Sequence, residues 1–171
     1  PVVIANDGGA LTSDAGVLLV QRLDRKLGIT RALAACLQEW RQPGKIEHSL
    51  PELLQQRIYQ LCLGYEDCND ADSLRTDPAL KLALARTPSA ADLASQATLS
   101  RLENSISARD CYRLSEALLE CYLARHRLHP PTRIILDVDT TDDLTHGQQQ
   151  GALFNTHYGG HCFLPLLLFA Q

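Results

Sequence analysis

Two consecutive prolines, Pro130 and Pro131, constrain the fold of this chain more than any other feature. Proline lacks a backbone N–H and blocks an α-helix that would run through it. Residues 133–139, which follow the pair, are rich in β-branched and aliphatic side chains and predict a strand. Before the pair, apolar residues recur at helical spacing. We therefore expect an α+β protein, with a mostly helical region over residues 1–130 and three antiparallel strands within residues 131–171.

Two acidic residues, Asp137 and Asp139, lie on this predicted strand. Side chains alternate along a strand, so both face the same side, about 7 Å apart at a rise of roughly 3.3 Å per residue. Like charges on an apolar strand need compensation, and the nearest basic residue in the sequence is Arg133. A divalent cation would compensate them, and carboxylate oxygens favour Mg²⁺ or Mn²⁺ over zinc. Alternatively, Asp139, Asp142 and Asp143 cap the turn after the strand.

Several motifs around this strand occur in a fixed order. The C-terminal motifs are Leu136-Asp137-Val138-Asp139-Thr140-Thr141-Asp142-Asp143, His146-Gly147-Gln148-Gln149, Gly151-Ala152 and His161-Cys162-Phe163-Leu164-Pro165-Leu166. The upstream motifs are Leu63-Gly64-Tyr65-Glu66-Asp67, Asn69-Asp70-Ala71-Asp72, Asp77-Pro78 and Ala94-Ser95-Gln96-Ala97-Thr98-Leu99-Ser100-Arg101-Leu102-Glu103-Asn104. Over nearly the whole chain, the sequence resembles DDE transposases of bacterial insertion sequences, and more narrowly the insertion-sequence 1380 family.

The resemblance implies an RNase H-like catalytic domain whose first strand carries the first of three metal-binding acids. That acid usually stands in an Asp-x-Thr motif, which maps onto Asp139-Thr140-Thr141. Asp139 is therefore the expected catalytic and metal-binding residue, and Asp137 is the second candidate. The resemblance also implies two Mg²⁺ or Mn²⁺ ions in the complete enzyme. Its partners would be double-stranded DNA, as transposon ends and target, and further copies of the chain in a homo-oligomer.

The ends of the chain predict a fragment. No Met is present, and the sequence stops directly after an apolar, strand-like run. The second Asp and the Glu of the family's triad would lie beyond residue 171. We expect an N-terminal fragment that ends early in the catalytic domain and has no activity by itself.

Arginine dominates the basic residues, which number sixteen, although the formal net charge of -4 does not mark a nucleic-acid binder. Two predicted helices resemble a helix-turn-helix, a short one from Thr98 to Asn104 and a long one over residues 108–127. Two packed helices with solvated arginines are the other interpretation, which leaves phosphate contacts more plausible than base contacts. The resemblance places transposon-end binding in the N-terminal part. The candidate DNA-binding residues are Arg101, Arg109 and Arg113.

Helix signals recur along residues 14–127. Asp14 and Gly28 bound a helix with the stripe Leu19, Leu23 and Leu27, and Ser49 with Glu52 forms a capping box. The stripe expected for the second of these helices is Leu54, Ile58, Leu61 and Cys62, and the core face expected for the long helix is Cys111, Leu114, Leu118 and Tyr122. Asp77-Pro78 starts another helix. Pro88 and nearby serines predict a flexible joint at residues 86–95.

The six cysteines and the apolar runs exclude two classes of protein. The cysteines are irregularly spaced and no secretory signal is present, so we expect reduced core thiols in a cytoplasmic protein. The resemblance implies that this protein is bacterial and nucleoid-associated. The longest apolar run, residues 162–170, is too short to cross a bilayer. No membrane role is expected.

Two functions of different classes remain open, beside one alternative in which the protein is only structural. The preferred hypothesis is a fragment of a transposase that cleaves DNA and transfers strands with metal ions. The second is a catalytically inactive DNA-binding or interaction module derived from such an enzyme. The third is a structural helical protein whose acids only cap turns.

Overall fold

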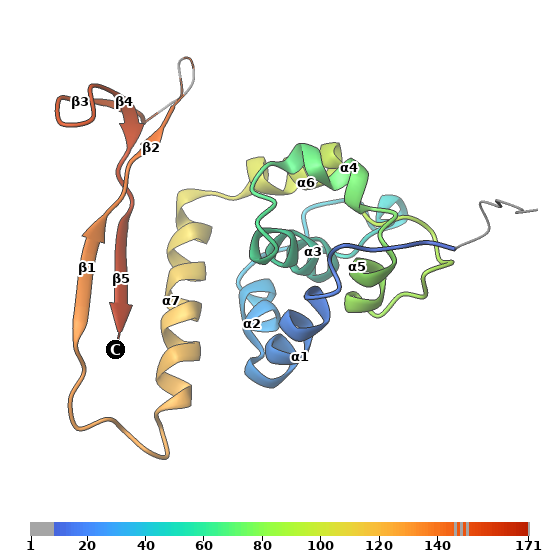
Figure 1. Cartoon of the computed structure of the whole chain (residues 1–171), viewed down its shortest axis with the longest axis horizontal. Coiled ribbons are helices and arrows are strands. Elements are labelled where there is room, and N and C mark those ends of the chain that lie inside the picture. Colours follow the sequence, from blue (N-terminus) through green and yellow to red (C-terminus); the bar gives the residue numbers. More distant parts are fainter. Residues whose placement is uncertain (1–8, 146, 148, 150, 171) are drawn as a thin grey trace, which may run out of the picture. The chain divides into compact units, whose positions relative to one another are not determined.

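The computed structural model describes residues 9–145, 147, 149 and 151–170. The chain divides into two compact units, Pro1–Arg125 and His126–Gln171. Within the described residues, the first unit holds seven α-helices and the second holds two small antiparallel sheets (Figure 1). The α+β class is confirmed. The run Val2-Val3-Ile4-Ala5, which predicts a short strand, and the loop residue His146 lie outside the described residues.

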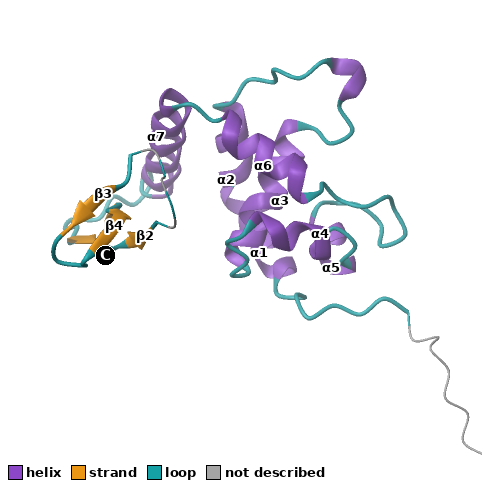
Figure 2. Cartoon of the chain, turned by 90° about the horizontal axis from the view of Figure 1, so that it is seen from above, coloured by secondary structure: helices purple, strands orange, loops and turns teal. Residues whose placement is uncertain are grey.

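The helical unit begins and ends its helices at residues with clear stereochemical reasons. Its α-helices are α1 (Val17–Leu27), α2 (Ile29–Ala35), α3 (Leu50–Cys62), α4 (Ala71–Leu74), α5 (Pro78–Ala83), α6 (Gln96–Ser105) and α7 (Ala108–Arg125), with 3₁₀ turns η1 (Pro43–Lys45) and η2 (Cys68–Asp70) (Figure 2). Gly28 ends α1 with a positive φ of 74°. The Ser49 hydroxyl accepts from the Glu52 N–H at 3.3 Å, and the Asp77 carboxylate accepts from the Leu80 N–H at 2.8 Å. The caps predicted at Ser49 and Asp77 are confirmed, whereas the start predicted at Asp14 is wrong, because α1 begins after Gly16 and the Asp14 carboxylate accepts from the Tyr65 hydroxyl.

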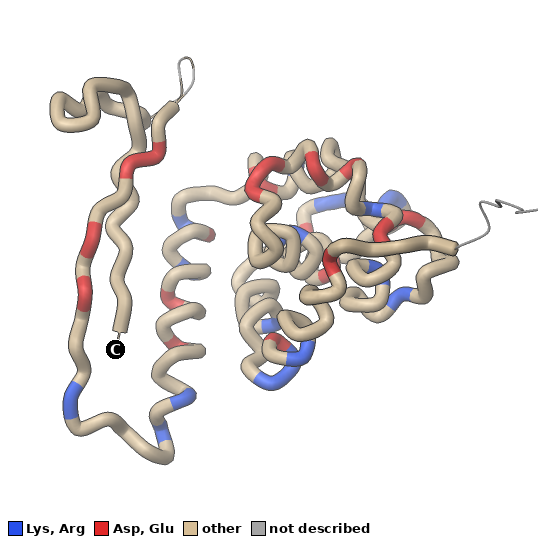
Figure 3. The backbone as a smooth tube through the Cα atoms, viewed as in Figure 1, with Lys and Arg blue, Asp and Glu red and all other residues tan. Residues whose placement is uncertain are grey.

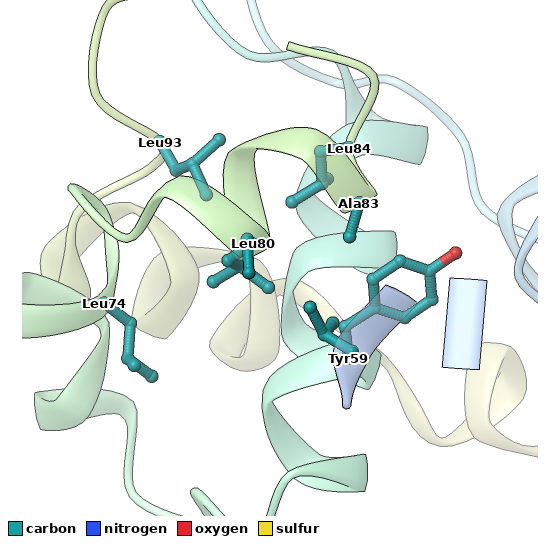
Figure 4. Packing of buried hydrophobic residues seen from close by; sticks show 8 residues of the cluster. Tyr59, Leu74, Leu80, Ala83, Leu84 and Leu93 are labelled. Atoms are coloured by element: carbon teal, nitrogen blue, oxygen red, sulfur yellow. The ribbon is translucent and has the colours of Figure 1, made fainter. Parts of the chain in front are cut away.

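Two hydrophobic clusters form the core of the helical unit. The first surrounds Tyr59 and Leu80 and gathers side chains from α1, α3, α4 and α5 (Figure 4). The second centres on Leu53 and Leu99 and joins α3, η2, α4 and α6. These short helices persist because each buries one face against its neighbours.

The expected apolar stripe of α1 is wrong, because a polar residue occupies its inner face. Leu19 and Leu23 are 74% and 57% exposed. Asp24 is buried instead and accepts hydrogen bonds from the Thr30 N–H at 2.9 Å and the Tyr59 hydroxyl at 3.0 Å. With its acceptors satisfied, a carboxylate can occupy a core position that the hydrophobic pattern reserved for leucine.

The stripe expected for α3 is wrong for the same reason. Leu61 and Cys62 are exposed, whereas Gln56, Arg57 and Gln60 are buried. The Gln56 side chain donates to the Ala94 carbonyl at 2.9 Å and accepts from the Ala94 N–H at 3.0 Å, as a second backbone would. Arg57 donates to two backbone carbonyl groups, those of residues 65 and 66. Polar side chains thus join α3 to its surroundings.

The long helix α7 does not supply a core face. No residue of α7 is buried, and the helix packs on α2, where the Cys36 thiol contacts the Arg113 carbonyl at 3.6 Å. Helix α6 packs on α3, η2 and α4 instead. A helix-turn-helix requires its two helices to pack on each other, so the arrangement favours solvated arginines on separately packed helices.

The segment expected to be a flexible joint, residues 86–95, is held in place. The buried Lys81 ammonium donates to the Ala90 carbonyl at 2.9 Å, and the Leu93 N–H donates to the Arg75 carbonyl at 3.0 Å. Leu93 and Ala94 are buried. Helix α6 then starts at Gln96, two residues before the start that was expected at Thr98.

The described residues of the second unit form five short strands where three were expected. They are β1 (Leu136–Thr140), β2 (Asp143–Leu144), β3 (Leu153–Asn155), β4 (Gly160–Phe163) and β5 (Leu166–Ala170). β1 pairs with β5, and a second sheet has the order β2-β4-β3. Pro165 lies between β4 and β5, which divides the predicted third strand because proline cannot donate to a ladder. The predicted turn at Gly159 is confirmed, and this residue has a φ of 68°.

The strands of the second unit leave their apolar side chains exposed. Every residue of β1 and β5 is exposed, including Leu168 at 63%, although the two strands are mostly aliphatic. Among the described residues of this unit, only Cys162 is buried. The sheet is therefore held by backbone pairing and not by a core of its own.

The cysteines are only partly as expected. All six are free, but just Cys68 and Cys162 are buried, while Cys62 and Cys111 are exposed. Burial raises the pKa of the Cys68 thiol to about 11, so it remains protonated at neutral pH. None of the helices in the described part of the chain has the length and hydrophobicity needed to span a membrane.

Candidate active site

Strand β1 carries both acidic candidates, Asp137 and Asp139. The strand forms because the two prolines before it end any helix and its β-branched residues favour an extended backbone. In the antiparallel register Asp137 lies opposite Phe169 and Asp139 lies opposite Leu167. Directly paired residues share a face. The two carboxylates therefore stand beside two large apolar side chains on one face of the sheet.

Both carboxylates are available for a ligand. They are exposed, and within the described residues no hydrogen bond or ion pair joins either of them to another group. Strand geometry separates their Cα atoms by about 7 Å. Figure 3 shows acidic positions following one another along β1. Their charge is not compensated by Arg133, which makes no ion pair with them in the described structure.

The turn after β1 gives no support to the interpretation of these acids as caps. The Thr141 N–H donates to the Pro165 carbonyl, at 3.3 Å, rather than to a carboxylate. Asp142 is exposed and Asp143 belongs to β2, opposite Phe163. In the described structure, no backbone N–H donates to a carboxylate of this turn. The acids of the turn are thus solvated.

The metal site that these residues could form is incomplete. The part of the chain that the structure describes holds no group of three or more His, Cys, Asp or Glu residues close enough to share an ion. Two carboxylates offer hard oxygen ligands of the kind that Mg²⁺ and Mn²⁺ prefer, but Mg²⁺ demands six ligands in octahedral geometry. Carboxylate oxygens are suitable ligands for such an ion. Two carboxylates are too few to complete its coordination, so further ligands must come from elsewhere.

The three arginines selected from the sequence lie in the helical unit and do not converge. Arg101 lies on α6 and lines a cavity, whereas Arg109 and Arg113 lie on α7. Arg113 forms a 3.8 Å ion pair with Asp110 one turn before it. Charges of both signs are interspersed over this unit (Figure 3). The cavity beside Arg101 includes Trp40, the only Trp in the chain, and this was the signal that sequence reasoning missed.

A comparison with protein-family models decides the class of this chain. The model described as transposase DDE domain group 1 matches residues 1–171, the whole of the chain. The chain belongs to this family. The match supports the DDE transposase class that the motifs of the sequence indicated. Transposases of this type act on DNA and generally use divalent metal ions. No curated protein and no solved structure matches the chain.

Proposed function

We propose that this transposase domain supplies the first metal-binding acid, Asp139, for DNA strand cleavage and strand transfer. The observation that carries the proposal is a pair of exposed, unpartnered carboxylates on one face of β1 in a chain of the DDE family. Asp139 stands in the Asp-x-Thr motif, and Asp137 is the second ligand on the same face. Divalent ions held there would activate water, and later a 3′-hydroxyl, for attack on a phosphodiester.

The residues around Asp139 have distinct supporting roles. Thr140 lies on the opposite face of β1, because side chains alternate along the strand. Thr141 comes back to the side of Asp139, so its hydroxyl is the better placed of the two to orient the carboxylate. Leu167 and Phe169 are the residues of β5 paired opposite the two acids.

The wider architecture is the second part of the proposal. Within the described residues β1 has one partner, β5, so its other edge can accept a further strand. The exposed leucines on both faces of the β1–β5 pair also call for covering layers. Both features support an RNase H-like sheet that is completed by segments carrying the remaining acids. We assign the domain to the insertion-sequence 1380 family of bacteria, acting on transposon ends as a homo-oligomer in the cytoplasm.

The decisive experiment replaces Asp139 in the transposase that carries this chain. Asp139→Asn keeps the shape of the side chain and removes the charge that binds a metal. We expect cleavage of transposon-end DNA in Mg²⁺ to fall more than about 100-fold, beyond the 10- to 100-fold loss typical of groups that only support a ligand. Isothermal titration with Mn²⁺ should show a matching loss of affinity.

Two further variants give this experiment its control. Asp142→Asn removes a nearby exposed carboxylate outside β1 and should change cleavage less than tenfold, on the order of a surface substitution. The loss of cleavage in Asp137→Asn should lie between the losses in Asp139→Asn and Asp142→Asn. Full cleavage by Asp139→Asn would refute the assignment.

A second candidate function is a catalytically inactive DNA-binding module. It is favoured by one observation, that the described part of the chain holds no group of three metal ligands. Salt-sensitive binding to transposon ends without Mg²⁺-dependent nicking in the complete protein would select this function. Nicking that depends on Asp139 would exclude it.

A further inference from the structure

The helical unit contains a cavity of about 640 Å³ that plays no part in the proposed catalytic site. It lies between the loop before α3 and one face of α6. Its main lining residues are Trp40, Arg41, Lys45, Leu53, Thr98 and Arg101. Leu53 is buried and forms an apolar floor, whereas Thr98 and Arg101 are one helical turn apart on α6 and form a polar wall. A volume of this size suits a small organic ligand.

Trp40 is held in an exposed position by its two neighbours. The Arg41 guanidinium donates to both oxygens of Glu39, at 2.8 and 2.6 Å, and the Arg41 N–H donates to the same carboxylate at 3.1 Å. The Lys45 N–H donates to the Gln42 carbonyl at 2.9 Å and closes the next turn. The indole nevertheless remains 60% exposed. A large aromatic side chain left in water on an ordered loop is characteristic of a binding surface.

The charge of the cavity favours an anionic ligand. Three cationic side chains, those of Arg41, Lys45 and Arg101, line the cavity together with one carboxylate, that of Glu47. Arg41 also forms an ion pair with Glu39. Within the described residues no carboxylate forms an ion pair with Lys45 or Arg101. Arg101 uses its Nε–H to bond the Ala97 carbonyl at 2.9 Å, which leaves both Nη groups for a ligand.

We propose that this cavity binds one unstacked nucleotide of DNA, with the base on Trp40 and the phosphate held by Lys45 and Arg101. Bases stack on aromatic side chains whatever their sequence, and basic groups beside the ring track the backbone. Inside a duplex the faces of each base are covered by its neighbours, so only a single-stranded or extruded base can occupy the site. The inference rests on the proposed function in that DNA is the partner, and it adds the form of DNA that is recognised.

Fluorescence of the full chain tests this directly, because Trp40 is the only Trp. A single-stranded oligonucleotide of about 12 nucleotides, within the site sizes known for such grooves, should quench Trp40 on binding. A perfectly paired duplex of the same sequence should bind without comparable quenching. A duplex with one unpaired, extrudable base should quench as the single strand does.

Matched variants separate stacking from charge. Trp40→Ala should weaken single-strand binding, measured by anisotropy, about five- to 150-fold, and Trp40→Phe should retain most of the affinity. Arg101→Ala should lower the slope of log affinity against log salt by about 0.7, the value for one phosphate contact on a single strand. Tyr112→Ala and Arg22→Ala, which change an exposed aromatic and an exposed arginine outside the cavity, should leave both quantities unchanged.

Three results would overturn the proposal. They are equal quenching by the perfect duplex, quenching of the same size by an acidic peptide, and unchanged single-strand affinity in Trp40→Ala. Failure of the proposed catalytic function has a different signature, which is full cleavage by Asp139→Asn, and this result would leave Trp40 quenching unaffected. The two proposals can therefore fail independently.

Discussion

The two units of this transposase domain bury their side chains in opposite ways. The helical unit has two hydrophobic clusters, and its buried Asp24, Gln56 and Arg57 all have hydrogen-bond partners. In the described part of the sheet unit, residues of β1 and β5 are exposed throughout, aliphatic and acidic alike. The first unit has an interior of its own. The second has backbone pairing and a pair of free carboxylates. These carboxylates can take part in a metal site that further ligands complete.

A matched pair of leucine truncations tests this contrast most strongly. Leu80 is fully buried in the helical core and Leu168 is largely exposed on β5. Leu80→Ala should cost about 2–5 kcal/mol, because it removes packing and leaves a cavity. Leu168→Ala should change stability by less than about 0.5 kcal/mol.

Hydrogen exchange read separately over residues 50–105 and 136–170 measures both effects, because each region reports its own opening free energy. An equal cost in the two regions would break the comparison. It would mean that the sheet of the protein in solution is covered by something that buries Leu168.

A polar substitution sharpens the comparison at an intermediate magnitude. Gln56→Met keeps the length of the side chain but leaves the buried Ala94 N–H and carbonyl without partners. We expect a loss of about 1–3 kcal/mol in the free energy of unfolding, the usual penalty for an unsatisfied buried group. Urea denaturation followed by the helical circular dichroism signal measures it. Thr145→Val, which removes an exposed hydrogen bond to the His161 carbonyl, is the matched change in the sheet unit and should be nearly neutral.

The smallest expected effect appears only at high pH. Burial, with a lesser contribution from the Asp24 carboxylate, raises the pKa of Tyr59 to about 12 from its ordinary value of 10.0. The folded state therefore keeps the phenol proton over a range in which the unfolded chain loses it. Its contribution to stability is complete below pH 10 and is lost as the pH rises from about 10 to 12.

The Tyr59→Phe variant isolates this contribution from other alkaline titrations. Its unfolding free energy should decline less steeply than that of the wild type above pH 10, and the two slopes should agree below that value. Parallel decline throughout the alkaline range would show that Tyr59 is not the titrating group.

Local signals in the sequence predicted the elements better than their inner faces. The caps at Ser49 and Asp77, the stop at Gly28 and the turn at Gly159 were predicted, because each depends on a few adjacent residues. The faces of α1 and α3 were not, because Asp24 and Gln56 become core residues only when distant partners satisfy them. The prediction of a flexible joint at residues 86–95 was also wrong, because Lys81 and Arg75, which lie outside this segment, form hydrogen bonds with it.

For the candidate acids Asp137 and Asp139, too, the sequence predicted a local property but not their tertiary surroundings. Their common face on β1 followed from strand periodicity. Their pairing with Leu167 and Phe169 could not be predicted, because the break at Pro165 changed the strand that faces them. The Trp40 cavity was missed because its walls come from segments more than fifty residues apart.

The sequence by itself determined helix ends with strong local signals, such as the caps at Ser49 and Asp77 and the stop at Gly28, and that Asp137 and Asp139 share one side of a strand. These properties depend on backbone stereochemistry over a few residues. Only the tertiary structure decided which side chains are buried, because partners such as Tyr59 for Asp24 and Ala94 for Gln56 come from other segments of the chain. It also decided that the acidic pair stays exposed while Trp40, Lys45 and Arg101 meet around one cavity.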